Sequence, residues 1–502
     1  MPSDLAVVLD CGATNARAVA IDETGQVVAE ASRPNAPRPQ PGGEPGWLIW
    51  DLDEVWGKLA DASREACAGL SAGRIRAVTV TTFGADGAPL TRDGTLTYPI
   101  ISWQCNRTEP TMQRLAQEMD PWDIYAETGY LLIPFNTLLR LLWLRQHAPQ
   151  ALDGADVWLM TPGLLSHRLS GEFSIDPTIA GTMMCMDMGK RTWSAEMLSL
   201  ADLDASFFPR WVEPGEVIGQ LTTAAAEATG LPAGIPVVAA GHDTQFAAVG
   251  SGAKPEEAIL SSGTWEILML RAGRYGPTRF AFEEGALIEC DAEPGLWNPQ
   301  LLMMASGVLE WIRDHFYRDI ADRSNAYQQM IADARDLPPG ATGVTVLPSF
   351  VAETGPTKKH NTHGTILGLT ITTRREQVYR AALEGLACQL RHALGILREA
   401  FPFEPKGIRV VGGGARNDLW NQIRADVTGL PVTTISQLEA TVLGAAMFAL
   451  VGAGRFSSVH EAQAAMASGE TTTEPSAARS AYDELYARYR LAPPALEGFY
   501  KA

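Results

Sequence analysis

The sequence predicts an α/β protein built of two similar lobes that flank a central cleft. One pattern occurs twice along the chain: a strand, a turn containing glycine and threonine, and a second strand, followed far downstream by a strand that leads through glycine into a helix. A chain of 502 residues is also too long for a single hydrophobic core. We therefore expect a first lobe over residues 1–250 and a second lobe over residues 251–502.

The first hairpin opens the chain. Residues 5–10 form an apolar run typical of a buried strand, residues 16–22 its returning partner, and Cys11-Gly12-Ala13-Thr14-Asn15 the turn between them. Such a turn can direct backbone N–H groups at phosphate oxygens, while Asp10 can hold a hydrated divalent cation beside Arg17. An ordinary hairpin turn, which Asp and Gly favour anyway, is the alternative that these residues leave open.

Two segments of the first half have the character of a sugar pocket. Residues 75–82 predict a strand that ends in Phe83-Gly84-Ala85-Asp86-Gly87, where the Asp86 carboxylate could accept hydrogen bonds from sugar hydroxyls. Trp103 lies in a stretch, residues 100–107, that combines an aromatic face with polar tips. A turn aspartate and a half-buried tryptophan at the edge of a core are the competing interpretations.

The segment Ala239-Ala240-Gly241-His242-Asp243-Thr244-Gln245 organises the rest of the chain. It follows the apolar run 235–238 and opens a small, apolar helix. Gly241 lets the backbone turn sharply, and Asp243 falls in the first helical turn, at a strand end of the kind where open α/β sheets place their ligands. A simple helix N-cap is the alternative role for Asp243.

The second half repeats these features. Residues 258–260 lead into Ser261-Ser262-Gly263-Thr264-Trp265 and a further apolar run. Residues 408–411 lead into Gly412-Gly413-Gly414-Ala415-Arg416-Asn417 and a helix that ends at Gly429. Between them, Thr373 and Glu376 have the spacing of a capping box at the start of a long helix. The tail after Gly452 is predicted to be helical.

Composition restricts the classes of function. A formal net charge of −18 would repel phosphate backbones, so we expect no nucleic-acid partner. The six cysteines lie far apart without a CxxC pair, which fits a reducing cytosol better than a disulfide framework or a zinc site. No apolar run reaches the roughly 18 residues of a membrane span. We expect a cytoplasmic protein without a membrane partner; its oligomeric state stays open, a homodimer included.

Read in order, four segments resemble the motifs of the FGGY family of carbohydrate kinases. These are residues 9–15, 240–245, 261–265 and 411–417, and residues 439–446 add a small-residue helix similar to the one on the family's nucleotide side. Each motif is short, but four in the right order at strand ends are specific. The resemblance covers nearly the whole chain. It implies two ribonuclease H-like lobes of the actin and sugar-kinase ATPase type, with ATP and Mg²⁺ as cofactors.

The resemblance also implies a role for each candidate residue. Asp243 would be catalytic and accept the proton of the sugar hydroxyl, and Asp10 would hold Mg²⁺ through water. The nucleotide- and phosphate-binding set would be Gly12, Thr14, Asn15, Arg17, Gly263, Thr264, Gly412, Gly413, Gly414 and Asn417. The sugar-binding set would be Gly84, Asp86, Trp103, His242 and Gln245.

Within the family, residues 81–84, 260–269 and 305–311 most resemble members that act on L-fuculose. The implied partner is therefore a small ketose, phosphorylated at its C1 hydroxyl. Many members carry an Asp after a Trp-Asn pair where this chain has Trp103-Gln104-Cys105, which argues against glycerol or xylulose. Two alternatives stay open: another ketose, such as L-rhamnulose or a pentulose, and a non-catalytic regulator that binds sugar and ATP.

Overall fold

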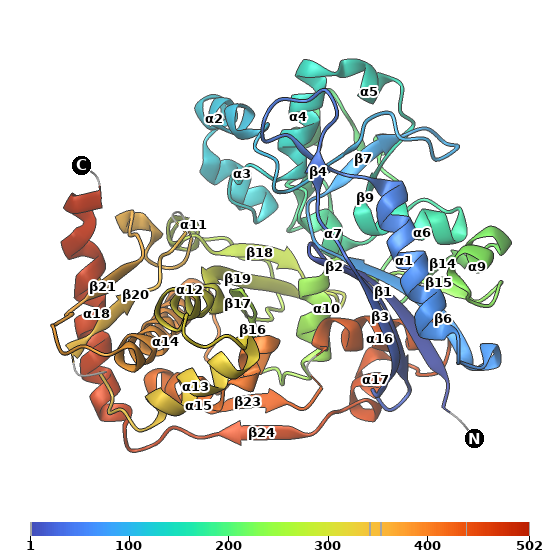
Figure 1. Cartoon of the computed structure of the whole chain (residues 1–502). Helices are drawn as coiled ribbons and strands as arrows, with labels where there is room; N and C mark the ends of the chain where they lie inside the picture. Colours follow the sequence, from blue (N-terminus) through green and yellow to red (C-terminus); the bar gives the residue numbers. More distant parts are fainter. Residues whose placement is uncertain (1–2, 341–342, 352–353, 438, 501–502) are drawn as a thin grey trace.

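A computed structural model describes residues 3–340, 343–351, 354–437 and 439–500, which form two lobes, each built on a β-sheet (Figure 1). The first sheet has the strand order β14-β15-β6-β1-β2-β3. From one edge to the other its strands are β14 (Val217–Gln220), β15 (Pro236–Val238), β6 (Ile75–Thr82), β1 (Leu5–Cys11), β2 (Asn15–Asp22) and β3 (Val27–Pro34).

The second sheet has the strand order β18-β19-β17-β16-β22-β23-β24. Its strands are β18 (Leu287–Cys290), β19 (Trp297–Met304), β17 (Trp265–Met269), β16 (Glu257–Ser262), β22 (Gly407–Val411), β23 (Val432–Ile435) and β24 (Glu470–Thr473). The edge strand β24, which pairs with β23, lies in the tail after Gly452. The sequence predicts this tail to be helical, so this part of the prediction is wrong.

The two sheets share one plan. In the first, β1, β2 and β3 pair antiparallel, while β6 and β15 run parallel to β1. In the second, β16, β17 and β19 form the antiparallel part, and β22 and β23 run parallel to β16. The central strands β1 and β22 are buried at every position, as expected for strands covered on both faces. The predicted α/β class with two ribonuclease H-like lobes is confirmed.

Helices cover both sheets. Helix α1 (Leu52–Cys67) packs on β2 and β3, and α6 (Thr161–Ser170) packs on β6. In the second lobe, α14 (Arg375–Ala400) packs against α15 (Asp418–Thr428). Helix α1 begins at Leu52, because the Asp51 carboxylate caps it by accepting hydrogen bonds from the N–H groups of Asp53 and Glu54.

The predicted capping box of α14 is wrong by one residue. The helix begins at Arg375, and the side chain of Gln377 accepts the hydrogen bond from the Arg374 N–H at 2.8 Å. The Thr373 hydroxyl instead accepts a hydrogen bond from the N–H of Thr370, within the preceding turn. Helix α15 ends where predicted, at Gly429, which adopts the left-handed conformation that favours glycine.

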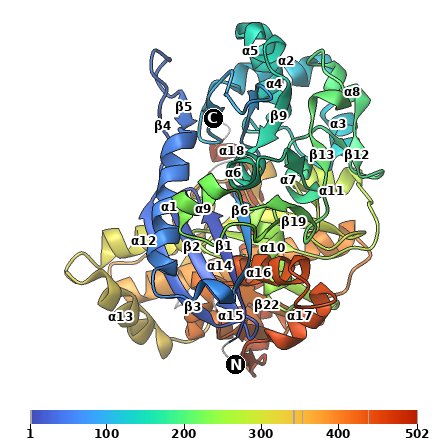
Figure 2. The ribbon, with the colours of Figure 1, turned by 90° about the vertical axis from the view of Figure 1, so that its right-hand side faces the viewer.

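Two further helices meet where the lobes join. Helix α10 (Asp243–Gly250) follows β15, α16 (Ala440–Gly452) follows β23, and the two lie side by side (Figure 2). A Cβ on Gly250 would overlap the carbonyl oxygen of Ala440, and one on Gly444 would overlap the carbonyl oxygen of Phe246. Glycine is therefore needed on both helices, because their backbones touch.

Helix α16 comes from the second half of the chain but completes the core of the first lobe. It packs on β6, β1 and β15. Its Val442 and Ala446 share a hydrophobic cluster with Ala6, Val8 and Val19 of the first sheet. Because ten of its thirteen residues are buried, the helix is apolar on nearly every side, as its sequence predicts.

A large insertion between β6 and β15 carries its own hydrophobic core, and much of this insertion lies at the top of Figure 1. Leu287 and Cys290 of β18 also pack into this core, so the edge of the second sheet contacts the first lobe. The insertion contains β7 (Gly87–Leu90), β8 (Ile100–Ile101), α2 (Glu109–Glu118), α3 (Pro121–Thr128), α4 (Thr137–His147), α5 (Pro149–Asp153), β9 (Val157–Met160), β10 (Ser174–Ile175), α7 (Pro177–Gly181), β11 (Met186–Asp187), β12 (Thr192–Trp193), α8 (Ala195–Ser199), β13 (Arg210–Trp211) and α9 (Thr223–Thr229).

The elements not yet described are β4 (Arg38–Pro39), β5 (Leu48–Trp50), α11 (Arg279–Glu284), α12 (Ser306–Phe316), α13 (Arg323–Arg335), β20 (Thr345–Leu347), β21 (Thr365–Leu367), α17 (Val459–Ala465) and α18 (Arg479–Tyr500). All six cysteines carry buried free thiols, in keeping with their wide spacing. Among the residues that the structure describes, every helix is too short or too polar to cross a bilayer.

Candidate active site

The turn before Asp243 is held in place by the first sheet. The carbonyl oxygen of Gly241 accepts hydrogen bonds from the Thr82 N–H at 3.0 Å and the Thr81 hydroxyl at 3.1 Å. A Cβ on Gly241 would overlap the carboxylate of Asp176, so only glycine fits beside this buried group. Asp243 is then the first residue of α10, and its carboxylate is 32% exposed. The turn thus presents a half-buried carboxylate at the end of β15.

Two carboxylates are arranged around Arg17, and the charge of Asp243 acts on one of them, Asp10. The Arg17 guanidinium donates to Oδ2 of Asp10 at 2.6 Å and to Oε2 of Glu439 at 2.7 Å. Burial raises the pKa of Asp10, Arg17 opposes this rise, and the charges of Asp243 and Glu439 add to it. Because Glu439 immediately precedes α16, this cluster joins the end of β1 to a segment from the second half of the chain.

His242 links Asp243 to a buried carboxylate of the second sheet. Its Nδ1 lies 3.2 Å from Oε2 of Glu289, and its Nε2 lies 3.4 Å from Oδ1 of Asp243. Gln245 donates from Nε2 to the same Glu289 oxygen at 2.7 Å, and the Tyr130 hydroxyl donates to Oε1. Although burial lowers it, the Glu289 charge and hydrogen bond raise the pKa of His242 to about 9. The contact with Glu289 therefore favours the protonated imidazole of His242 at neutral pH.

The pKa values of the two carboxylates on either side of His242 shift in opposite directions. Burial raises the pKa of Asp243, and the His242 charge only partly opposes this rise. Burial also raises the pKa of Glu289, but the His242 cation and the hydrogen bonds outweigh it and leave the pKa below its usual value. Glu289 is consequently a stable anion, whereas Asp243 is a stronger base than an exposed aspartate.

The first glycine turn is a tight connection between β1 and β2. The Gly12 N–H donates a hydrogen bond to the carbonyl oxygen of Asn15 at 2.8 Å. The buried Asn35 side chain donates to the carbonyl oxygen of Gly12 at 2.8 Å, and the Asn35 N–H donates to that of Thr14 at 2.8 Å. Thr14 and Asn15 are exposed at the tip. The turn is therefore fixed from behind and open in front, as a phosphate-binding turn requires.

The second glycine turn occupies the matching position between β16 and β17. The Gly263 N–H donates to the carbonyl oxygen of Trp265 at 2.9 Å. The start of α12 contacts this turn, because the Ser306 N–H donates to the carbonyl oxygen of Gly263 and the Gly307 N–H donates to that of Thr264. The structure therefore brings Gly263 and Thr264 to the same place in the second sheet that Gly12 and Thr14 have in the first.

The triple-glycine segment follows β22 and touches this second turn. Gly412 has a φ of +86°, and a Cβ there would lie 2.7 Å from the carbonyl oxygen of Ser262. A Cβ on Gly414 would overlap the Ser262 hydroxyl, whereas one on Gly413 would meet open space. Asn417 caps α15 by accepting from the Trp420 N–H at 3.1 Å. The segment lies beside the Gly263 turn, with Gly413 exposed at its tip.

Asp86 differs from the other candidates because its side chain is completely buried. Its Oδ2 accepts hydrogen bonds from Trp50 Nε1 at 2.7 Å and from the Trp103 N–H at 3.0 Å, and its Oδ1 pairs with Arg140 at 2.8 Å. Gly84 is half-buried, and a Cβ there would lie 3.2 Å from Nε2 of His242. The carboxylate of Asp86 thus faces the protein interior and fixes the backbone of the exposed Trp103.

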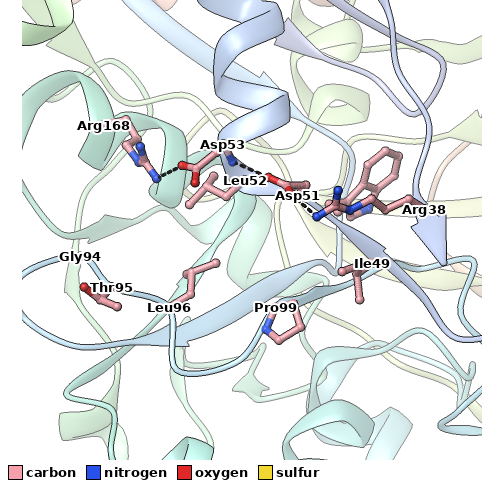
Figure 3. A pocket seen from close by; sticks show the side chains of 11 residues that line it. Arg38, Ile49, Asp51, Leu52, Asp53, Gly94, Thr95, Leu96, Pro99 and Arg168 are labelled. Carbon is pink, nitrogen blue, oxygen red and sulfur yellow. Dashed lines mark hydrogen bonds and ion pairs between the residues drawn. The ribbon is translucent and has the colours of Figure 1, made fainter. Parts of the chain in front are cut away.

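A separate pocket lies in the first lobe between the start of α1, residues 94–99 and the end of α6 (Figure 3). Arg168 pairs with Asp53 at 2.6 Å, and Arg38 pairs with Asp51 (Figure 3). The basic and acidic groups of this pocket therefore neutralise one another. None of the predicted site residues, all of which the structure describes, is among its lining residues.

The sequence does not predict three side chains of the site, those of Glu289, Tyr130 and Glu439. Glu289 and Tyr130 lie far from Asp243 in sequence, and Glu439 was noted only as the start of a small-residue helix. The one available signal for Glu289 is a carboxylate within the apolar run Leu287-Ile288-Glu289-Cys290, where a buried charge needs a partner. Nothing in the local sequence identifies that partner as His242.

The oxygen donors at the end of β1 fit a hard divalent cation. Within the described part of the chain, the hydrogen bonds to Asp10 fall on Oδ2. Among those same residues, no group of three or more His, Cys, Asp or Glu side chains could hold a metal ion. The protein would therefore contribute few direct ligands, as is usual for Mg²⁺, which keeps several waters and binds substrate phosphates.

Comparisons with known proteins agree with this architecture. The N-terminal domain of the FGGY family of carbohydrate kinases matches residues 5–250, and its C-terminal domain matches residues 258–453. The chain is 42% identical over 464 residues to an L-fuculokinase of Escherichia coli (strain K12), covering 92% of this chain and 96% of that protein. It is 29% identical over 499 residues to an autoinducer-2 kinase of the same strain, covering 93% and 90%.

A solved structure shows the same fold along the whole chain. The crystal structure of a xylulose kinase from Rhodospirillum rubrum aligns with a TM-score of 0.88 at 25% identity and covers 99% of this chain and 100% of that one. The family matches to both halves of the sequence, the similar plan of the two sheets and the similarity to the curated relatives therefore indicate the same family. The chain belongs to the FGGY family of carbohydrate kinases and is a phosphotransferase that acts on an alcohol group.

Proposed function

We propose that the protein transfers the γ-phosphoryl group of ATP to the C1 hydroxyl of L-fuculose, which yields L-fuculose 1-phosphate and ADP. The observation that carries this proposal is the partly exposed Asp243 carboxylate at the junction of the lobes, close enough to Asp10 for its charge to act on that residue. The choice of sugar is supported by the 42% identity to an L-fuculokinase along nearly the full length of both chains.

Asp243 is the proton acceptor of the proposed reaction. It takes the proton of the sugar hydroxyl as the bond to phosphorus forms, late in a loose transition state. Burial raises the pKa of Asp243, which brings the carboxylate nearer to the pH at which a general base works best. The neighbouring His242 cation keeps the carboxylate ionised and can also donate a hydrogen bond to the sugar.

The two glycine turns bind the triphosphate from opposite lobes. Their exposed tips, Thr14 and Asn15 in the first lobe and Thr264 in the second, supply N–H and hydroxyl donors to phosphate oxygens. Arg17 adds a positive charge between them. The segment Gly412-Gly413-Gly414 passes close to the nucleotide, and Asn417 lies on the adenosine side. Mg²⁺, held through water by Asp10, would neutralise charge that develops on the phosphate oxygens.

The sugar contacts Gly84, Trp103 and His242 in this proposal, and the buried Gln245 supports the subsite through its hydrogen bond to Glu289, which also contacts His242. Gly84 gives room next to His242, and the exposed Trp103 ring offers an apolar face to the ketose. Asp86 belongs to the same subsite through the hydrogen bond that it accepts from the Trp103 N–H. Its contribution is to orient the tryptophan.

We further propose a first lobe over residues 1–250 that carries the sugar site and a second over residues 251–502 that carries the nucleotide site, with α16 of the second half packed on the sheet of the first. The six free buried thiols support a location in the reducing cytoplasm. The net charge of −18 argues against a nucleic-acid partner.

The substrate is tested by ADP release, measured with a coupled assay across a panel of ketoses. We expect the highest kcat/KM for L-fuculose, with L-rhamnulose and pentuloses lower. A higher value for another ketose would transfer the assignment to that sugar without changing the chemistry. Sugar binding without sugar-dependent ADP release would instead identify a regulator and refute the kinase proposal.

Replacing Asp10 by alanine is expected to weaken the use of Mg²⁺ and ATP more than the binding of sugar. Removing Asp10 deletes the oxygen donor at the end of β1 and leaves the Arg17 charge less balanced. Steady-state kinetics with varied Mg²⁺, together with calorimetry for the sugar, would measure both effects. A larger loss in sugar affinity than in nucleotide use would contradict the role given to Asp10.

A further inference from the structure

Glu289 is a charged residue of the second sheet that is buried in the first lobe. It lies on the edge strand β18, and its side chain is 1% exposed. Among the residues that the structure describes, the hydrogen-bond partners of its carboxylate are Tyr130, His242 and Gln245, which all belong to the first lobe. The neighbouring backbone is docked as well, since the Ile288 N–H donates to the carbonyl oxygen of Gly129 at 2.9 Å. Glu289 is thus where the second lobe reaches the acceptor site of the first.

His242 lies between Glu289 and Asp243 and contacts each through a different ring nitrogen. The Nδ1 side faces Glu289 at 3.2 Å, and the Nε2 side faces Asp243 at 3.4 Å. Asp176 is a further charged group that acts on the imidazole, and the Tyr130 hydroxyl donates a hydrogen bond to Glu289. The backbone of His242 is fixed too, because its N–H donates to the Thr178 hydroxyl at 2.9 Å.

We propose that Glu289 is a positioning residue of the second lobe, which holds His242 as an imidazolium directed at Asp243 and thereby keeps the proton acceptor ionised. This inference rests on the proposed function, in which Asp243 accepts the proton of the sugar hydroxyl. It adds that the docking of β18 against the first lobe completes the acceptor site.

The electrostatic balance supports this role. Burial alone lowers the pKa of His242, and Glu289 provides the largest opposing contribution. Without Glu289, burial prevails and the imidazole becomes neutral near pH 7. Asp243 then loses the cation at 3.4 Å, and its own burial raises its pKa further. The anion of Glu289 also raises the pKa of Asp243, but it acts from the far side of the imidazole, so loss of the cation has the larger effect.

The test is the pH dependence of kcat in Glu289→Gln, which keeps the size of the side chain and removes its charge. Activity falls at acidic pH as Asp243 becomes protonated, so a higher pKa moves this acidic limb to higher pH. We expect a shift of about one pH unit or more, the effect of an opposite charge at such short distance. A limb that stays in place, or that moves to lower pH, would overturn the proposal.

Tyr130→Phe is the matched control. It removes a hydrogen bond to the same carboxylate and loosens the same contact between the lobes, but it changes no charge. We expect its acidic limb to stay close to that of the unchanged enzyme. If Tyr130→Phe shifts the limb as far as Glu289→Gln does, Glu289 only holds the lobes together and the inference is wrong.

A measurement on the unchanged protein keeps the inference testable if Glu289→Gln does not fold. With ¹⁵N-labelled histidine, the imidazole signals of His242, assigned by their loss in His242→Gln, should show both ring nitrogens protonated at pH 7. A neutral ring at pH 7 would refute the inference. This result is independent of catalysis, so it is distinct from a failure of the proposed function, which full activity of Asp243→Asn would reveal.

Discussion

Asp243→Asn is expected to fold normally and to lose about 10²- to 10⁴-fold in kcat, the range that general base catalysis contributes. The amide is nearly the same size as the carboxylate, and its oxygen can still accept the hydrogen bond from the Thr244 N–H at 2.6 Å. What disappears is the ability to take the proton of the sugar hydroxyl. Sugar affinity should change little, because a base acts mainly in the transition state.

The measurement is sugar-dependent ADP release at saturating sugar and ATP, with calorimetry for sugar binding. Asp418→Asn is a suitable control, since Asp418 also begins a helix and its carboxylate accepts from the next N–H, at 2.9 Å. It lies outside the carboxylate cluster, so its turnover should stay near that of the unchanged enzyme. Near-normal turnover in Asp243→Asn would remove this residue from the mechanism and leave Asp243 as a helix-start residue only.

Gly444→Ala is expected to have the largest effect on stability, a loss of about 3 kcal/mol or more in the free energy of unfolding, the upper range for overpacking. The added Cβ would overlap the carbonyl oxygen of Phe246 and lie 2.9 Å from the N–H nitrogen of Gly250. Both obstacles are backbone atoms of α10, so no side-chain rotation relieves the overlap. The two helices must separate, and Asp243 at the start of α10 moves with them.

The chain offers a matched control for this substitution. Gly395 is an exposed glycine in the interior of α14, and a Cβ there would meet nothing within 4 Å. Gly395→Ala should therefore stabilise the protein by about 0.5–1 kcal/mol through helix propensity alone. Thermal and urea unfolding of both variants would measure the contrast. Equal midpoints in the two variants would mean that contact between α10 and α16 does not limit stability.

Much of the fold could be predicted because its signals are local. A strand such as Leu5–Cys11 appears as an apolar run, and its return through a turn of small residues appears in the same window. The repetition of this hairpin in the second half indicates two lobes. Asp243 was found for the same reason: a strand, a glycine and a helix start are contiguous in sequence and fix where a carboxylate must lie.

The undetected parts of the site depend on contacts between distant segments. Glu289 belongs to the site because it contacts Tyr130 and His242, and Glu439 belongs to it because it pairs with Arg17. No local sequence pattern predicts these contacts. Asp86 shows the opposite problem, since a turn carboxylate beside glycine has the same sequence pattern whether it faces a ligand or the protein interior. The start of α14 was misjudged because Gln377 caps the helix as well as the expected Glu376 would.

The placement of α16 has a consequence for how the protein is made. Residues 440–452 leave the ribosome long after residues 5–82, yet they cover the face of β1 and β6 that those earlier residues form. A nascent chain that has emerged only as far as residue 250 therefore carries an uncovered apolar sheet face, which favours association with other chains or with chaperones. For the same reason, a gene divided at this point should yield an insoluble first fragment unless the second is present during its folding.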